Sequence, residues 1–190
     1  MRSVKFSRIA ALAVSLVLAA ASLCACASDP GGGSGTISAD GELTVHFLDV
    51  GQADSTLLVS DGEAMLIDAG NRDDAAFITG YLADQGIDHL KYIVFTHPHE
   101  DHIGSGEAVI AAADVDRIFM MDGYDEGIDA SLKRAVDENG IATTAPEPGD
   151  TAQLGECRID FLGPVREHDD ANDDSICLKV THGDNSFMFT

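Results

Sequence analysis

The stretch "FTHPHEDHIG", residues 95–104, holds three of the seven histidines of this 190-residue chain and two carboxylates within ten positions. It overlaps the end of the apolar run "LKYIVFT", residues 90–96, which is typical of a short buried strand. Pro98 lacks an N–H group and disfavours helical geometry for His97 before it. We therefore expect a loop at the end of a strand, rather than the start of a helix.

The residue types of this loop favour a metal site. His97 and His99, two positions apart in a loop, can converge on one cation. Asp101 and His102 add a carboxylate and a third imidazole, and mixed nitrogen and oxygen ligands suit Zn²⁺ or another first-row divalent ion. A two-metal site is feasible with these four residues. The other histidines stand apart: we expect structural roles for His46, His89 and His182, while His168, in an acidic loop, is a candidate ligand without other support.

The rest of the chain predicts a layered α/β domain. Three strand-like segments around the turn at Asp61 and Gly62 predict an antiparallel meander: residues 42–50, 55–60 and 63–70. Helices and strands then alternate, with helices expected from Asp73 to the stop signal at Gly86 and over residues 106–114 and 129–140, and strands over 90–96, 117–121, 158–162, 176–180 and 186–189. Helices follow the strands that precede Asp68 and the histidine loop, so these polar loops lie at the carboxyl ends of strands, where open α/β sheets usually bind ligands.

The N-terminus predicts export and lipidation. Three basic residues precede an apolar, alanine-rich stretch from Ile9 to Leu23, as in a secretory signal. The "LCAC" that ends it resembles the lipobox of bacterial lipoproteins, with Cys26 as the acylated residue. We expect residues 1–25 to be a lipoprotein signal peptide, residues 26–40 a flexible Gly/Ser tether, and residues 41–190 the folded domain. Ordinary secretion and an uncleaved anchor are the alternatives.

Charge and cysteine usage limit the function further. The formal charge is −22, and cleavage after Ala25 would remove three basic and no acidic residues, which gives −25. Such an acidic surface opposes binding of nucleic acid or anionic lipid unless cations or a local basic patch compensate. Cys157 and Cys177 could form a disulfide outside the cytoplasm, but strand alternation points one thiol inward and the other outward, which argues against it.

The motifs together resemble a known family. "THPHEDH" is similar to the H-x-H-x-D-H signature of the metallo-β-lactamase superfamily. In order and spacing, "FLDVGQADSTLL", "LIDAG", "FTHPHEDHIG" and "DANDDSICLKVTHGDNSFMFT" resemble the hydrolase domain of ComEC-type DNA-uptake (competence) proteins over about residues 43–190. The resemblance implies a metallo-β-lactamase-like αββα sandwich with one or two Zn²⁺ or Mn²⁺ ions.

The resemblance also implies residue roles. His97 and His99 would bind one metal, and Asp101 and His102 the other; Asp101 could also orient the attacking water or accept its proton. Asp68 would support the metal loop without binding metal, although capping of the turn before Gly70 explains it equally well. In the "DANDDS" variant of the third motif, Asn172 and Ser175 would hold substrate or a metal-bound water, and Asp170 is either a ligand or part of a solvated acidic loop.

The chain departs from the family pattern at two further places. Ala53 replaces a glycine of the family's "GQGD", and it would be strained if that position needs a positive φ. The chain stops at "FMFT", before the later Asp and His ligands of the family, so we expect a C-terminally incomplete domain that ends on an apolar strand.

Three functions remain open from the sequence. The first is a membrane-tethered, extracytoplasmic hydrolase of phosphodiesters such as nucleic acid, and the second is a hydrolase of the same fold acting on a small ester, amide or lactam. The third is a catalytically incomplete, metal-binding surface lipoprotein. The expected partners are a small-molecule or nucleic-acid substrate and the membrane, through the lipid anchor; no protein partner can be inferred.

Overall fold

The computed structural model describes residues 41–121, 130–166 and 170–190. The predicted signal peptide, tether and lipidated Cys26, together with His168, lie outside the described residues. Among the described residues, no helix has the length and apolar character needed to cross a membrane.

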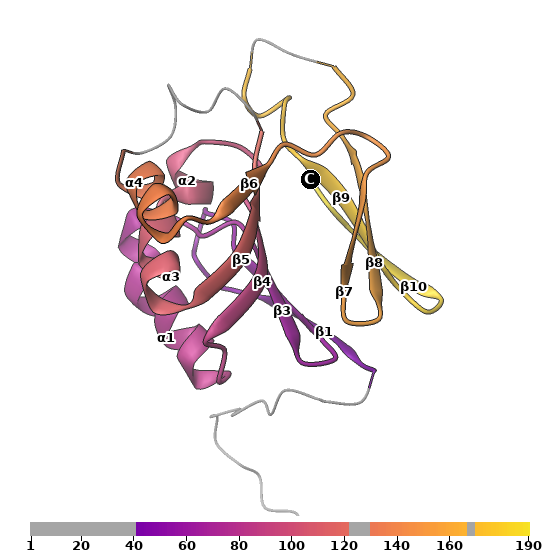
Figure 1. The fold of residues 1–190 in the computed structure, drawn as a ribbon, viewed down its shortest axis with the longest axis horizontal. Helices are drawn as coiled ribbons and strands as arrows, with labels where there is room; N and C mark the ends of the chain where they lie inside the picture. The colour runs from indigo at the N-terminus through magenta and orange to yellow at the C-terminus, as the bar shows by residue number, and fades with distance from the viewer. Residues whose placement is uncertain (1–40, 122–129, 167–169) are drawn as a thin grey trace, which may run out of the picture. The chain divides into compact units, whose positions relative to one another are not determined.

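Two sheets and one helical layer make up the domain (Figure 1). The first sheet has six strands in chain order: β1 (Leu43–Phe47), β2 (Thr56–Ser60), β3 (Glu63–Ile67), β4 (His89–Val94), β5 (Asp114–Phe119) and β6 (Ala142–Thr144). The pairs from β1 to β3 are antiparallel, as the predicted meander requires, and those from β3 to β6 are parallel. The second sheet is antiparallel in the order β10-β9-β8-β7, from β7 (Thr151–Leu154), β8 (Cys157–Gly163), β9 (Cys177–His182) and β10 (Asn185–Phe189).

The helices cover the face of the first sheet that turns away from the second sheet (Figure 1). They are the 3₁₀ turn η1 (Arg72–Asp74), α1 (Ala75–Asp84), α2 (Glu100–Ile103), α3 (Gly106–Ala112) and α4 (Ala130–Asn139). Within the described residues the layers are therefore helix, sheet and sheet, and the outer face of the second sheet carries no helix there.

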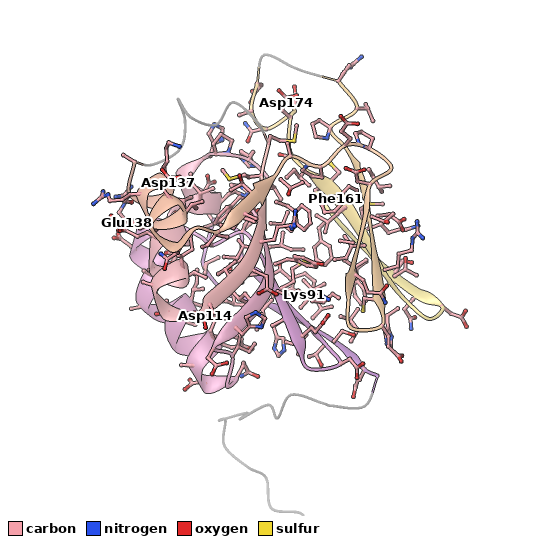
Figure 2. All side chains as sticks on the ribbon, viewed as in Figure 1. Lys91, Asp114, Asp137, Glu138, Phe161 and Asp174 are labelled. Atoms are coloured by element: carbon pink, nitrogen blue, oxygen red, sulfur yellow. The ribbon has the colours of Figure 1, made fainter. Side chains whose placement is uncertain are left out.

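Strand alternation builds two hydrophobic cores. On β3, Leu66 points to the helices and packs in the core between helices and sheet, whereas Met65 and Ile67 pack in the core between the two sheets. Phe161 lies between the sheets (Figure 2), with its ring centroid 4.7 Å from that of Phe119. Burial of both faces of the first sheet fixes its register, and with it the positions of the loops at the strand ends.

Three elements differ from the sequence prediction. The short helix α2 begins at Glu100, inside the stretch predicted to be a loop, so that prediction holds for His97 and Pro98 but is wrong for Asp101 and His102. Strands β6 and β7 were not predicted, because they have only three and four residues and contain no apolar run. Ala53 is buried and is not among the residues with positive φ, so the strain considered for it does not arise.

The two cysteines in the described part of the chain are both free thiols, in agreement with the predicted alternation. Cys157 is fully buried among the residues of the inter-sheet core, and Cys177 is half-buried. Burial raises the pKa of both thiols. They therefore behave as packing residues rather than as nucleophiles.

Candidate metal centre

Parallel pairing brings the two polar loops to the same edge of the first sheet. Ile67 at the end of β3 pairs with Val94 at the end of β4, so Asp68 and the histidine loop leave the sheet side by side. The Asp68 N–H donates to the Val94 carbonyl at 2.9 Å and continues the ladder by one bond. The prediction that these loops lie together at the carboxyl ends of strands is confirmed.

Asp68 is the centre of a buried hydrogen-bond network. Its Oδ1 accepts the Thr96 N–H at 2.8 Å, and its Oδ2 accepts the Thr96 hydroxyl at 2.7 Å and Nδ1 of His102 at 2.8 Å. Asp68 has φ of 56°, a left-handed conformation that aspartate tolerates better than most residues but that still carries strain. The structure thus places Asp68 where it orients His102, and its contacts exceed those of a simple turn cap.

The hydroxyl groups around His97 determine which of its ring nitrogens carries the proton. The Thr96 hydroxyl donates to Asp68, and the Ser175 hydroxyl donates to the Asn172 carbonyl at 2.8 Å. Both oxygens can therefore only accept from Nδ1 of His97, which lies 3.2 Å from Thr96 Oγ1 and 3.3 Å from Ser175 Oγ. We assign the proton to Nδ1, which leaves a lone pair on Nε2.

The Nε2 atom of His97 fits a metal-binding role. His97 is 4% exposed, and its Nε2 has no hydrogen-bond partner among the described residues. An unpaired polar atom in a buried place costs about 1–3 kcal/mol unless something binds it. A bare imidazole nitrogen is a ligand for first-row divalent cations, so this atom suits the predicted metal.

The three imidazoles pack ring against ring. The ring centroid of His97 lies 3.9 Å from that of His102 and 4.8 Å from that of exposed His99. Asp101 Oδ2 is 3.9 Å from Nε2 of His102. However, within residues 41–121, 130–166 and 170–190 no three His, Cys, Asp or Glu side chains form a ready metal-binding group. The candidate ligands are thus neighbours, with a donor set that fits Zn²⁺ or Mn²⁺, but they do not form a closed cage.

The electrostatics separate the two inner histidines. Desolvation, followed by the neighbouring His102 and His99, lowers the pKa of His97 to about 4, so the ring is neutral at pH 7. Burial also opposes charge on His102, but the hydrogen bond and charge of Asp68 outweigh it and raise the His102 pKa. Burial raises the pKa of Asp68 too, against the donors on its oxygens. We take Asp68 as ionised, because three donors converge on its oxygens.

The third motif lies next to the histidine loop. The Ile176 N–H donates to the Thr96 carbonyl at 2.9 Å, which ties the start of β9 to the loop after β4. Asp170 is exposed and accepts hydrogen bonds from the N–H and side-chain amide of Asn172, which lower the Asp170 pKa, with smaller effects from His99 and His97. Ser175 contacts His97 directly, whereas the side chains of Asp170 and Asn172 bind each other.

The structure adds one carboxylate that the sequence prediction did not include among the site residues. Asp54, in the turn before β2, has its Oδ2 3.7 Å from Nε2 of His102. The hairpin register could have indicated it: Thr56 at the start of β2 pairs with Ile67 at the end of β3, so the turn before β2 reaches the same sheet edge as Asp68.

Two of the histidines predicted to be structural have partners outside the cluster. Nδ1 of His46 lies 2.8 Å from the Tyr81 hydroxyl, and Nε2 of His89 lies 2.9 Å from Asp116 Oδ1. His182, at the end of β9, is half-buried.

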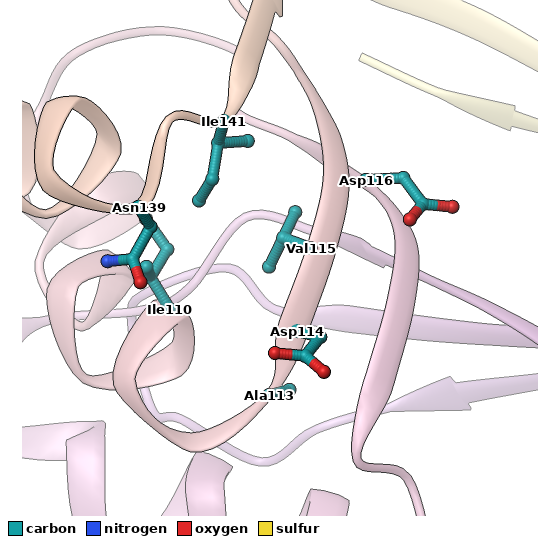
Figure 3. Close-up of a pocket in the computed structure, with 7 residues that line it drawn as sticks. All are labelled: Ile110, Ala113, Asp114, Val115, Asp116, Asn139 and Ile141. Carbon is teal, nitrogen blue, oxygen red and sulfur yellow. The ribbon is translucent and has the colours of Figure 1, made fainter.

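A separate cavity of about 140 Å³ lies at the opposite end of the parallel strands (Figure 3). It is bordered by the end of α3, the start of β5 and the segment between α4 and β6: Ile110, Ala113, Asp114, Val115, Asp116, Asn139 and Ile141. These lining residues include no histidine, cysteine or serine, so the cavity does not share the chemistry of the histidine cluster.

A family profile described as the metallo-beta-lactamase superfamily matches residues 48–190. The chain belongs to this superfamily. The ComE operon protein 3 of Bacillus subtilis (strain 168) is 26% identical over 174 residues, in a match that covers 81% of this chain and 22% of that protein. The chain therefore spans about a fifth of the length of this curated relative.

Solved structures share the superfamily fold. The metallo-beta-lactamase fold protein YhfI from Bacillus subtilis matches with a TM-score of 0.54 and 20% identity, over 76% of this chain and 57% of YhfI. CmlA from Streptomyces venezuelae, described as a diiron beta-hydroxylase, matches with a TM-score of 0.51 and 15% identity, over 77% of this chain and 28% of CmlA. The predicted fold class is confirmed, and the chain spans just over half the length of YhfI.

Proposed function

We propose that this chain is an extracytoplasmic, metal-dependent hydrolase that cleaves phosphodiester bonds in a nucleic-acid-like substrate. The observation that carries the proposal is the buried, unpaired Nε2 of His97 within a group of three imidazoles at the carboxyl ends of β3 and β4. The superfamily is usually hydrolytic, which supports the reaction type. The similarity to the ComE operon protein 3, together with the resemblance to ComEC-type DNA-uptake proteins, supports the substrate class.

The proposed metal ligands are His97 and His99 for one Zn²⁺ and Asp101 and His102 for the other, with Mn²⁺ as the alternative ion. A bound divalent ion would lower the pKa of the attacking water and polarise the scissile phosphate.

The side chains of the chain itself supply orientation and proton transfer. Asp68 accepts the Nδ1 proton of His102 and thereby directs the Nε2 of that ring towards Asp101. Thr96 and Ser175 hold Nδ1 of His97 in the same way, so its Nε2 stays unprotonated. The Asp101 carboxylate, whose side chain is 36% exposed, would accept a proton from the attacking water. The segment from Asp170 to Ser175 would contact the substrate.

The proposed location rests on the N-terminal sequence. Cys26 in "LCAC" would be acylated after removal of residues 1–25, and residues 26–40 would tether the domain to the outer face of the cell membrane. Incorporation of radiolabelled palmitate into the wild-type chain, and its loss in Cys26→Ala, is the expected result. Equal labelling of both chains would contradict acylation at Cys26.

The substrate class is tested by comparing four substrates with the full chain loaded with Zn²⁺ or Mn²⁺. We expect hydrolysis of bis(p-nitrophenyl) phosphate and of a short single-stranded DNA, loss of that activity in His97→Ala, and full activity in His89→Ala, whose imidazole pairs with Asp116 outside the cluster. Turnover of p-nitrophenyl acetate or of a lactam without phosphodiester turnover would overturn the substrate class. Metal binding without any hydrolysis would overturn the enzymatic proposal and favour a metal-binding surface lipoprotein.

The charge of the chain adds a second criterion. A formal charge of −22 repels a polyanion, and salt screens this repulsion within about 10 Å at 0.1 M. The KM for single-stranded DNA should therefore fall as salt rises from low to moderate concentration, in contrast to the weakening that salt causes for basic nucleic-acid-binding proteins. A KM that rises steadily with salt over that range would contradict this expectation.

A further inference from the structure

Phe47 is a large apolar side chain that faces solvent although its neighbours along the sheet are buried. It ends β1, and the strand register places it in one row with Thr56, Ile67 and Val94 across the first sheet. Ile67 and Val94 are 4% and 0% exposed in the core between the sheets, whereas Phe47 is 72% exposed. It is the most exposed phenylalanine among the described residues.

Strand alternation gives the direction of the Phe47 side chain. On β1, Leu43 and Val45 pack against the core between the sheets, and Phe47, two residues further on, belongs to the same face. His46 points the other way, and its Nδ1 lies 2.8 Å from the Tyr81 hydroxyl on α1. Phe47 therefore lies on the face of the first sheet that turns away from the helices.

The end of β1 adjoins the candidate metal centre. The N–H of Leu48, which follows Phe47, donates to the Ser55 carbonyl at 3.0 Å. Ser55 follows Asp54, whose Oδ2 lies 3.7 Å from Nε2 of His102. Two strand spacings separate β1 from β3, so the Phe47 backbone lies about 10 Å from the end of β3. The ring is thus close enough to contact a group beside a phosphate held at the histidine cluster.

The charge of the chain favours an uncharged contact with a nucleic-acid-like substrate. A formal charge of −22 opposes the binding of phosphates. Stacking of a base on an aromatic ring needs no positive charge, and it tolerates any sequence because every base has a π-face. An exposed phenylalanine at the edge of the site supplies such a contact.

We infer that Phe47 is a substrate-positioning residue that stacks on a nucleobase beside the scissile phosphodiester. The inference rests on the proposed function and deepens it, because it names the part of the substrate that the chain recognises. The stacked base holds the adjacent phosphodiester at the histidine cluster. Single strands are the preferred form, because the bases of a duplex are already stacked on one another and are not free to pack on the ring.

The first test compares a short single-stranded DNA with an abasic oligonucleotide of the same length, using the full chain loaded with Zn²⁺ or Mn²⁺. Phe47→Ala should raise the KM for the DNA about fivefold or more, the loss typical of one stacked base. Its kcat should stay within about twofold of wild type, and its KM for the abasic oligonucleotide should not change. Phe77→Ala is the matched control, because Phe77 is a 45% exposed phenylalanine that contacts Tyr81 on α1.

The second test does not depend on hydrolysis. The chain contains no tryptophan, so Phe47→Trp and Phe77→Trp each introduce a single fluorophore. Single-stranded DNA should quench the fluorescence of Phe47→Trp and leave that of Phe77→Trp unchanged, whereas the abasic oligonucleotide should quench neither.

Three results would overturn the inference: a wild-type KM for DNA in Phe47→Ala, an equal rise in its KM for the abasic oligonucleotide, or equal quenching in the two tryptophan variants. A different result would overturn the proposed hydrolysis alone. In that case the wild-type chain would cleave no phosphodiester, while DNA but not the abasic oligonucleotide would still quench Phe47→Trp.

Discussion

Replacement of Thr96 by valine tests the network that orients the histidines. The hydroxyl of Thr96 donates to the buried Asp68 carboxylate at 2.7 Å and lies 3.2 Å from Nδ1 of His97. Valine keeps the shape and branching of threonine, so the change removes these contacts without creating a large cavity. A hydrogen bond to a charged group contributes about 1.5–3 kcal/mol, and after its loss Asp68 Oδ2 keeps the hydrogen bond with Nδ1 of His102.

Thr96→Val should therefore lower the free energy of unfolding by about 2 kcal/mol. For a chain of this size that corresponds to a decrease in Tm of roughly 4–8 °C. The measurement is urea denaturation followed by circular dichroism at pH 7, with the m-value checked for constancy so that the change in midpoint reports stability.

Thr79→Val is the matched control for this change. The Thr79 hydroxyl donates at 2.7 Å to the Ala75 carbonyl one helical turn earlier, which is a neutral and partly solvated acceptor. Such hydrogen bonds within a helix contribute little, so we expect a change of about 0.5 kcal/mol or less. If Thr96→Val loses no more stability than Thr79→Val, the Asp68 network does not stabilise the site as argued.

Two further predictions concern the contact between the sheets. Gly155→Ala should destabilise the domain by about 3 kcal/mol or more, because φ is 52° and a Cβ would clash with the Ser60 carbonyl oxygen. Gly183→Ala is the matched control: its φ is 56° but the space around it is open, so it should lose only about 1–2 kcal/mol in the same urea denaturation. Glu63→Gln should lower the free energy of unfolding at neutral pH, because burial of Glu63 is outweighed by hydrogen bonds from Gly155 and Lys91, which lower the Glu63 pKa. This stabilisation is complete above the unfolded-state pKa of about 4.5 and is lost as the pH falls through the folded-state pKa. A stability difference between wild type and variant that stays constant from pH 7 to pH 3 would contradict this prediction.

The sequence predicts most of the fold because the apolar patterns are strong. The apolar runs that became β2, β3 and β4 are largely buried, and their lengths leave few alternatives to a sheet. The four-residue helix α2 could not be predicted in this way, since a single helical turn shows no periodicity. Pro98 disfavours helical geometry only for the residue before it, so it does not prevent a helix from beginning at Glu100. Strands β6 and β7 are defined by their partners, because segments of three and four residues carry too short an apolar pattern to be recognised alone.

Some features of the candidate site follow from the sequence, whereas others depend on tertiary packing. The grouping of His97, His99 and His102 follows from their closeness in sequence, and the position of Asp68 beside them follows from parallel strand pairing. The contact of Ser175 with His97 depends on the packing of the second sheet over the first, which no local pattern encodes. Asp54 lies near His102 because its N–H donates to the carbonyl of Asp101, which is 47 positions further along the chain.

The central claim is that the histidine cluster binds metal through His97 and His99. The most direct measurement is the zinc content per chain after equilibrium dialysis of the full chain, determined by mass spectrometry for wild type, His97→Ala and His99→Ala, with His89→Ala as the control. We expect at least one Zn²⁺ per chain in wild type and His89→Ala, and a loss of at least one bound Zn²⁺ per chain in the other two variants, which should remain folded. Unchanged zinc content in both His97→Ala and His99→Ala, or no zinc in the wild-type chain, would contradict the claim.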